Sequence, residues 1–267
     1  MRIIAITAVV LALTITAALL FLQTEEIEQT QISASNRTLE QSVGTRYQPV
    51  ASPFTPVLRE ISPPAFQGAN SIWGSTGRDD NGHIWLGVSG SGKDPAHLVE
   101  FDPELERFID HGDPVAALRS TGIYREGEQQ VKIHSKIIQM DDGWLYFASM
   151  DETGENSKSG QLPRWGSHFW RYNPSADHWQ HLFAAPEGLI AVSGVGRFVY
   201  ALGYWGHILY QYDTHTGESR QIRVGSEGGH ISRNLISDSN GHVYVPKVKY
   251  IKLKPEGDND TCLLYTS

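Results

Sequence analysis

The stretch of sequence that decides the fold is Asp79-Asp80-Asn81-Gly82-His83-Ile84-Trp85-Leu86-Gly87, because the chain returns to this pattern several times. It is a polar turn that ends in glycine and continues into a short apolar and aromatic segment. Close copies are Asp141-Asp142-Gly143-Trp144-Leu145-Tyr146-Phe147-Ala148 and Asp238-Ser239-Asn240-Gly241-His242-Val243-Tyr244-Val245, and a looser copy is Gly194-Val195-Gly196-Arg197-Phe198-Val199-Tyr200-Ala201. The pattern is typical of a hairpin turn that enters a buried strand.

Other elements recur around each copy of the turn. An apolar run precedes the turn. After each of the first three copies in chain order, those with Gly82, Gly143 and Gly196, an alternating apolar and polar segment ends in an Asx turn. The alternating segments are 98–103, 169–174 and 209–214, and the shorter strand patterns that follow them are 107–109, 178–183 and 219–224. Each unit is therefore predicted to contain four short strands.

This repeated unit predicts an all-β fold, namely a β-propeller built from four-stranded antiparallel blades. Three full blades are expected, together with part of a fourth that begins near Ser232. The ring is thus predicted to be incomplete, with one hydrophobic helix before it at the N-terminus. The alternative is a β-sandwich, which is disfavoured by the uniform unit and by the aromatic residue that follows each turn glycine.

The Asp-rich turn, its glycine, the aromatic strand and the Tyr-Asp or Tyr-Asn-Pro ending resemble exported β-propeller proteins. The groups in question are the streptogramin-lyase, gluconolactonase and sensor-kinase periplasmic propellers, and the resemblance covers about residues 67 to 250. It implies a propeller fold on the exported side of a membrane. Since propellers carry many unrelated functions, the activity must be argued from the residues of a site.

Charge and cysteine content narrow the functional classes. The net charge is −8 and no Lys/Arg run is present, so nucleic acid is not an expected partner. The single cysteine, Cys262, opens a terminal hexapeptide, residues 262–267, that resembles a translated sequencing adapter. We therefore assign residues 262–267 to an adapter-derived tail and expect no disulfide framework.

The N-terminal region predicts export. Residues 3–22 carry no charge and are long enough to span a bilayer as a helix, which favours a retained signal anchor over a cleaved signal peptide. Arg2 precedes this segment and Glu25 follows it, so the rest of the chain is expected on the periplasmic or extracellular face. Residues 23–66 are polar and rich in proline and are expected to form a stalk. The partial propeller is assigned to residues 67–261.

In a propeller, the loops between blades and those between second and third strands lie on one face, opposite the Asp-Gly turns. Turn carboxylates such as Asp79 and Asp142 are therefore expected to cap backbone amides rather than to act in catalysis. The insertions 111–131 and 151–165 are expected to be peripheral loops, and no further helix is expected. On the functional face we predict ligand-binding residues, namely Lys93, Arg164, Trp165, Tyr204 and Trp205.

Histidines suggest a second kind of site. A propeller has a central channel, and four histidines are predicted to face it, namely His134, His168, His207 and His230. There they would bind a divalent metal or act as general bases. A propeller lyase of the oligogalacturonate-lyase kind would use His134 with Lys136 or Arg233, the cations holding a substrate carboxylate. The alternative for these histidines is a structural role at strand edges. Gluconolactonase-type propellers hold their metal with acidic and amide side chains, and no matching inward set is found here.

The sequence thus favours an exported, membrane-tethered propeller that binds a small-molecule or carbohydrate-like ligand on one face. A metal-dependent lyase or lactonase is the alternative enzyme, and a purely structural role is the third possibility. Convergence of three or more of the four histidines would favour the enzyme. Exposure of Trp165 and Trp205 on the same face would favour the binding module.

Overall fold

The computed structural model describes residues 59–63, 65–156, 159–204, 208–224, 234–247 and 263–266. The chain divides into two compact units, Met1–Glu60 and Ile61–Ser267, and all strands described below belong to the second. The expected helix over residues 3–22 lies outside the described residues. Within the described residues, no helix has the length and apolar character needed to cross a membrane.

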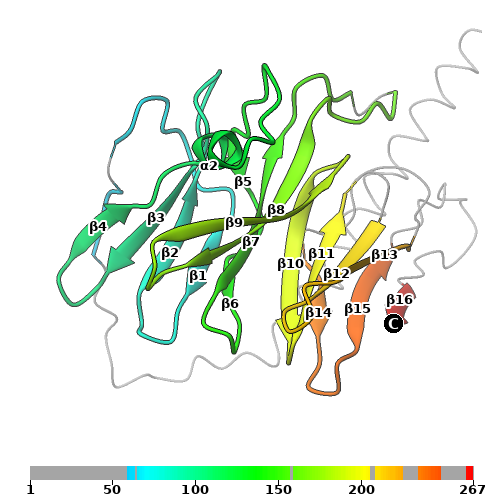
Figure 1. The fold of residues 1–267 in the computed structure, drawn as a ribbon. Helices are drawn as coiled ribbons and strands as arrows, with labels where there is room; N and C mark the ends of the chain where they lie inside the picture. The colour runs from blue at the N-terminus through cyan, green and yellow to red at the C-terminus, as the bar shows by residue number, and fades with distance from the viewer. Residues whose placement is uncertain are drawn as a thin grey trace, which may run out of the picture. The chain divides into compact units, whose positions relative to one another are not determined.

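The described part of the second unit consists mainly of four antiparallel sheets, which confirms the all-β class (Figure 1). Within each sheet the strands pair in chain order, as the repeated unit predicts. The first sheet contains β1 (Thr76–Arg78), β2 (Ile84–Val88), β3 (His97–Asp102) and β4 (Arg107–Asp110). The third contains β10 (Leu189–Val195), β11 (Phe198–Gly203), β12 (Ile208–Asp213) and β13 (Ser219–Arg223).

The second and fourth sheets vary this plan. In the second sheet two short strands, β5 (Lys132–Ile133) and β6 (Ile138–Gln139), both pair with β7 (Leu145–Asp151), and β8 (Gly166–Asn173) and β9 (His178–Ala185) follow. The fourth sheet contains β14 (Ile236–Ser237), β15 (Val243–Lys247) and β16 (Leu263–Thr266). β16 falls in the hexapeptide that resembles an adapter. An open strand edge pairs with any available strand, so this pairing does not bear on the origin of the hexapeptide.

The aspartates of the repeated turn act as predicted, by satisfying local donors. In three copies of the turn, one carboxylate oxygen accepts a hydrogen bond from the aromatic side chain that follows the turn glycine. The bonds are Trp85 Nε1 to Asp79 Oδ2 (3.0 Å), Tyr146 OH to Asp142 Oδ2 (2.6 Å) and Tyr244 OH to Asp238 Oδ2 (3.0 Å). The other oxygen accepts from backbone N–H groups of the same turn. The pairing explains why aspartate and the aromatic residue recur together.

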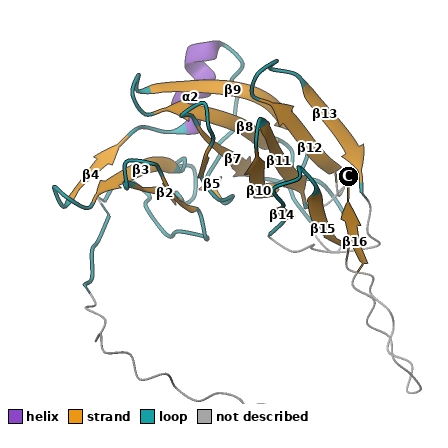
Figure 2. Ribbon diagram, turned by 90° about the horizontal axis from the view of Figure 1, so that it is seen from below, coloured by secondary structure: helices purple, strands orange, loops and turns teal. Residues whose placement is uncertain are grey.

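Neighbouring sheets share apolar clusters, and these clusters form the core. The cluster between the first and second sheets contains Trp85 and Trp170, both fully buried, and the one between the second and third contains Tyr146 and Phe169. A third cluster joins the third and fourth sheets around Tyr200. Each fully buried aromatic side chain contributes roughly 2–3 kcal/mol of hydrophobic stabilisation. The two views show the sheets side by side in chain order (Figures 1 and 2).

The sequence-based expectation of a loop over residues 111–131, with no further helix, was wrong. Residues Pro114–Thr121 form a helix, α2, whose Asp113 side chain accepts a hydrogen bond from Ala116 N at 2.8 Å. Proline occupies the first turn, and Gly122 ends the helix in the left-handed conformation (φ 74°). The N-cap aspartate, the proline and the terminal glycine are a recognised helix signature. The segment was missed because two turns are too short for apolar periodicity to appear.

Candidate functional site

The best-formed candidate site is a cavity of about 170 Å³ that receives side chains from three sheets. We call it the three-sheet pocket. Its lining residues are Trp73 before β1, Lys132 in β5, His134 after β5, Met150 in β7, Glu152 after β7, Ile190 in β10 and Tyr204 after β11. They lie at the starts of first strands or at the ends of second strands. In an antiparallel sheet both positions fall on the edge opposite the Asp-Gly turns, which is the edge that the sequence predicted to be functional.

One wall of the three-sheet pocket is polar and carries a cation and an anion in contact. Lys132 Nζ lies 2.5 Å from Glu152 Oε2 and 5.1 Å from the centre of the Trp73 ring. The His134 ring is 6.1 Å from that of Trp73. Opposite charges this close cancel each other's field over most of the cavity. The described part of the wall is therefore polar without carrying an excess charge.

The remaining lining of the pocket combines a buried floor with an exposed aromatic side chain. Met150, Ile190 and Tyr204 form a small buried apolar cluster. The Tyr204 hydroxyl donates a hydrogen bond to Glu155 Oε1 at 3.3 Å. Trp73, in contrast, is 45% exposed, which is high for so large an apolar side chain. An apolar floor, a few placed polar groups and an exposed aromatic ring are features of a small-molecule site.

Only some of the site residues predicted from sequence line this pocket. His134 and Tyr204 do, and the sequence missed the neighbouring Trp73, Lys132 and Glu152. Lys132 lies in the first strand of the second sheet, and Trp73, just before β1, is its counterpart in the first sheet. Lys93 and Lys136 are exposed and are not among the described lining residues. Trp205, His207, His230 and Arg233 lie outside the described residues.

Trp165 and Arg164, predicted to bind ligand, are engaged with other parts of the protein. The Trp165 ring has Arg164 at 4.6 Å and Arg125 at 4.9 Å from its centre, measured from each guanidinium carbon. Its indole N–H donates to Gly127 O at 3.2 Å. These contacts hold the ring against the 111–131 segment. They make it a structural part of the rim of the second sheet, and its ligand-binding role stays a prediction.

His168 belongs to a buried hydrogen-bond network rather than to the three-sheet pocket. Its Nε2 lies 2.6 Å from Glu128 Oε1, and its Nδ1 lies 2.8 Å from His181 Nε2. Glu128 also accepts from Gln130 Nε2 at 2.9 Å and from the partly exposed Arg125. A bulge between His181 and Phe183 in β9 accompanies this arrangement, as bulges commonly re-aim side chains. Both ring nitrogens of His168 are therefore occupied.

The metal prediction is not tested by the structure. Among the described residues, no group of three or more His, Cys, Asp or Glu side chains is placed to hold a metal ion. His134 and His168 have different surroundings, the first at the three-sheet pocket and the second beside Glu128. With His207 and His230 outside the described residues, the four-histidine site remains a prediction.

The buried network should make stability depend on pH. Burial and then the charge of His168 lower the pKa of His181 to about 4, against 6.5 for a free imidazole. Between these values the unfolded state binds the proton more readily, so this stabilisation is complete above pH 6.5 and is lost as pH falls toward 4. After discounting for partial exposure, we expect a contribution on the order of 1 kcal/mol.

Chemical denaturation at pH 7.5 and pH 5 would measure this effect. The His181→Asn variant, which removes the titrating group, should lose less stability over the interval than the parent protein. Equal losses in the two proteins would show that His181 is not held neutral by the fold.

The carboxyl of Glu128 changes its protonation at lower pH than His181 does in the unfolded chain. Although burial opposes it, the hydrogen bond and charge of His168 and then Arg125 lower the pKa of this carboxyl.

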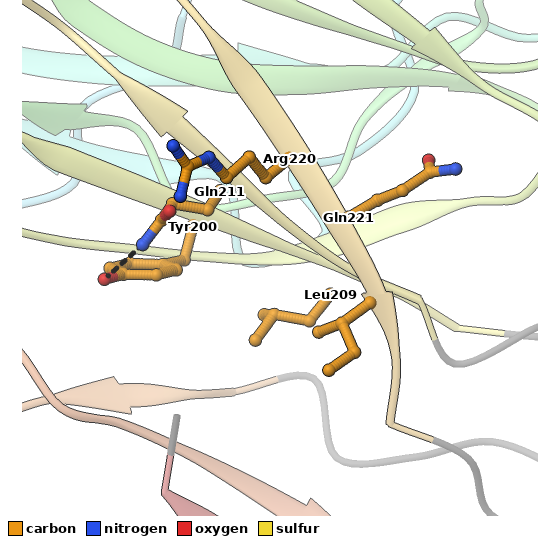
Figure 3. Close-up of a pocket in the computed structure, with 6 residues that line it drawn as sticks. Tyr200, Leu209, Gln211, Arg220 and Gln221 are labelled. Carbon is orange, nitrogen blue, oxygen red and sulfur yellow. Dashed lines mark hydrogen bonds between the residues drawn. The ribbon is translucent and has the colours of Figure 1, made fainter.

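A second hollow, of about 250 Å³, lies on the outer part of the third sheet (Figure 3). Its described lining comes from β11, β12 and β13, through Tyr200, Leu209, Gln211, Arg220, Gln221 and Ile222. Gln211 Nε2 donates to the Tyr200 hydroxyl at 3.1 Å inside it.

Cross-strand register explains the origin of this hollow. Leu202, Leu209 and Ile222 form a row across the third sheet, as Ala148, Phe169 and Phe183 do across the second. In the second sheet the end of the row is covered, because Phe183 stacks on Tyr210 of the third sheet at 5.1 Å. In the third sheet Ile222 is 59% exposed. This hollow is therefore a stretch of sheet face, and the three-sheet pocket is the better candidate for a ligand.

Comparison with known proteins assigns no family. No family model matches the chain, and no curated protein matches it. Among solved structures, the extracellular domain of BT4673 from B. thetaiotaomicron, described as a one component system, has a TM-score of 0.45 and 15% identity. A second structure of that domain, described as part of a hybrid two component system, has a TM-score of 0.45 and 14% identity.

The extent of these matches is limited. Both BT4673 matches cover 66% of this chain and 20% of the other, so this chain spans a fifth of their length. A chain of the mitotic checkpoint complex matches with a TM-score of 0.44 and 8% identity, covering 74% of this chain and 54% of that chain. At such scores and identities the likeness carries no functional information.

Proposed function

We propose that the four sheets are blades of a β-propeller, and that the protein is an exported module that binds a small-molecule or carbohydrate-like ligand in the three-sheet pocket. The blade arrangement is supported by the way the first strands meet. Ile137 N, before β6, donates to Thr76 O in β1 at 3.2 Å. Ser237 Oγ, in β14, donates to Gly194 O in β10 at 2.9 Å. First strands that meet in chain order are what an arc of blades requires.

The composition of the three-sheet pocket is the observation that carries the binding function. Three sheets contribute to it, and the lining combines the exposed Trp73 with the Lys132–Glu152 pair and the buried Met150 and Ile190. An empty structural cavity in a core is lined by apolar side chains. Export is supported by the uncharged segment over residues 3–22. That segment would also tether the module to a membrane.

A ligand screen with matched variants tests this proposal. A thermal-shift panel of monosaccharides, amino acids and small organic acids should contain a compound that stabilises the protein, by about 2.7 kcal/mol at 100 times its Kd. Trp73→Ala should weaken binding of that compound at least tenfold, because it removes the exposed ring. Trp144→Ala is the matched control. Trp144 lies at the Asp-Gly turn of the second sheet, so its loss should leave the affinity unchanged.

Two outcomes would contradict the proposal. A panel in which no compound raises the melting temperature would remove the evidence for a small-molecule site. A compound whose affinity is the same in the parent protein and in Trp73→Ala would place the binding elsewhere on the molecule.

A further inference from the structure

Resting on the proposed function, we infer that the ligand of the three-sheet pocket is an uncharged sugar ring: a neutral pyranose, or the terminal pyranose of a longer glycan. The juxtaposition that carries this inference is the exposed ring of Trp73 beside the contacting charges of Lys132 and Glu152. The charge of the wall, the geometry of the polar groups and the size of the cavity each support it.

The charge of the wall disfavours ionic ligands. Lys132 and Glu152 are the charged residues among the described lining of the pocket, and they are in contact at 2.5 Å. A carboxylate ligand would gain from Lys132 but would meet Glu152 at nearly the same distance. A cationic ligand would have the reverse problem. Moving either ion out of water then costs free energy that its interactions with the wall do not offset.

The other cations near this edge are committed to different contacts. Arg164 and Arg125 both pack on the Trp165 ring, and Arg125 also bonds Glu128. Lys136 is not among the described lining residues. Among the described lining residues, a uronic acid, which the lyase alternative would require, therefore meets one lysine, and that lysine is already paired with Glu152.

Adjacent hydroxyl groups suit the lysine–glutamate pair. One hydroxyl can accept a hydrogen bond from the Lys132 ammonium while the next donates to the Glu152 carboxylate, and the ion pair need not separate. A zwitterionic amino acid would have to insert its two charges between these partners. The lysine–glutamate pair is therefore better suited to binding a polyol than to binding an ion.

The apolar parts of the pocket fit the other character of a sugar. The C–H face of a pyranose is apolar and packs on an aromatic ring, and Trp73, which is 45% exposed, lines the cavity. Met150 and Ile190 offer an apolar floor. The cavity, at about 170 Å³, holds about six waters at roughly 30 Å³ each. That volume suits one ring and is below the 300–1,000 Å³ that is usual for larger ligands.

The inference is tested with chemically matched probes at pH 7.5. Methyl β-glucopyranoside, galactopyranoside and mannopyranoside would each be compared with methyl β-glucuronide and with alanine, by saturation-transfer NMR and calorimetric titration. At least one neutral glycoside should bind at least tenfold more tightly than the glucuronide. That binding should be lost in Trp73→Ala.

A charge variant separates recognition from simple loss of structure. Glu152→Gln keeps the side-chain shape but leaves the Lys132 ammonium without its anion. This variant should bind the glucuronide about tenfold more tightly than the parent protein does. Its melting temperature, measured in parallel, should change little because Glu152 is partly exposed.

The possible outcomes distinguish the inference from the proposed function. If the glucuronide or alanine binds more tightly than every neutral glycoside and depends on Trp73, the sugar inference is overturned and the binding function stands. If no neutral glycoside binds, the inference is likewise overturned. If compounds bind but Trp73→Ala and Glu152→Gln alter no affinity, both the inference and the proposed site are wrong.

Discussion

Replacing Glu128 by alanine is expected to lower the free energy of unfolding by about 3–5 kcal/mol. The side chain is inaccessible to solvent and accepts hydrogen bonds from Gln130 and Arg125, with His168 Nε2 at 2.6 Å. Without the carboxylate, the buried side chains of Gln130 and His168 lose their common partner, and each buried donor left unpaired costs about 1–3 kcal/mol.

Urea denaturation of three variants would measure this effect. Glu128→Gln keeps one acceptor oxygen and should recover part of the loss, which separates the hydrogen-bonding role from that of the charge. Glu104→Ala, at an exposed position in the β3–β4 turn, should change stability by less than about 0.5 kcal/mol. If the free energy of unfolding of Glu128→Ala lies within about 1 kcal/mol of that of the parent protein, the hydrogen bonds around His168 are not formed in the folded protein.

Glu128 also shows where sequence reasoning reached its limit. The repeated turn is local, so the role of its aspartates could be predicted from their spacing: Asp79 and Asp142 accept hydrogen bonds from N–H groups of their own turns. Glu128 lies in an insertion that no repeat constrains, and its partner His168 is forty residues away. Burial of a polar side chain in such a segment depends on tertiary packing, which apolar periodicity does not report.

The candidate site divides in the same way. The edge that carries it follows from strand alternation and from the position of the turns, and His134 and Tyr204, two residues predicted from sequence, line the pocket there. Which side chains turn into the cavity could not be predicted. Trp165 is held by two arginines, while Trp73 is left exposed beside Lys132. Whether a tryptophan is held by other side chains or left exposed at the cavity depends on how separate sheets pack against one another.

The packing between sheets leads to the second large effect, at Gly77 in β1. A Cβ atom at this position would lie 2.0 Å from the carbonyl oxygen of Ile137, a backbone atom of the neighbouring sheet. Real Cβ atoms essentially never come within 3.0 Å of such an atom, so one of the two chains would have to move. Gly77→Ala is therefore expected to destabilise the protein by about 3 kcal/mol, at the upper end of the cost of overpacking.

The sign of this effect makes the experiment decisive. Alanine in place of glycine in a strand normally gains about 0.5–1 kcal/mol, because the unfolded chain loses freedom. Thr76→Ala, at the exposed neighbouring position, serves as the control for a small change in the same strand. Thermal unfolding should show a clear loss for Gly77→Ala and a small change for Thr76→Ala. A stabilised Gly77→Ala protein would mean that the first strands do not approach this closely, and the proposed blade arrangement, with the pocket it creates, would have to be abandoned.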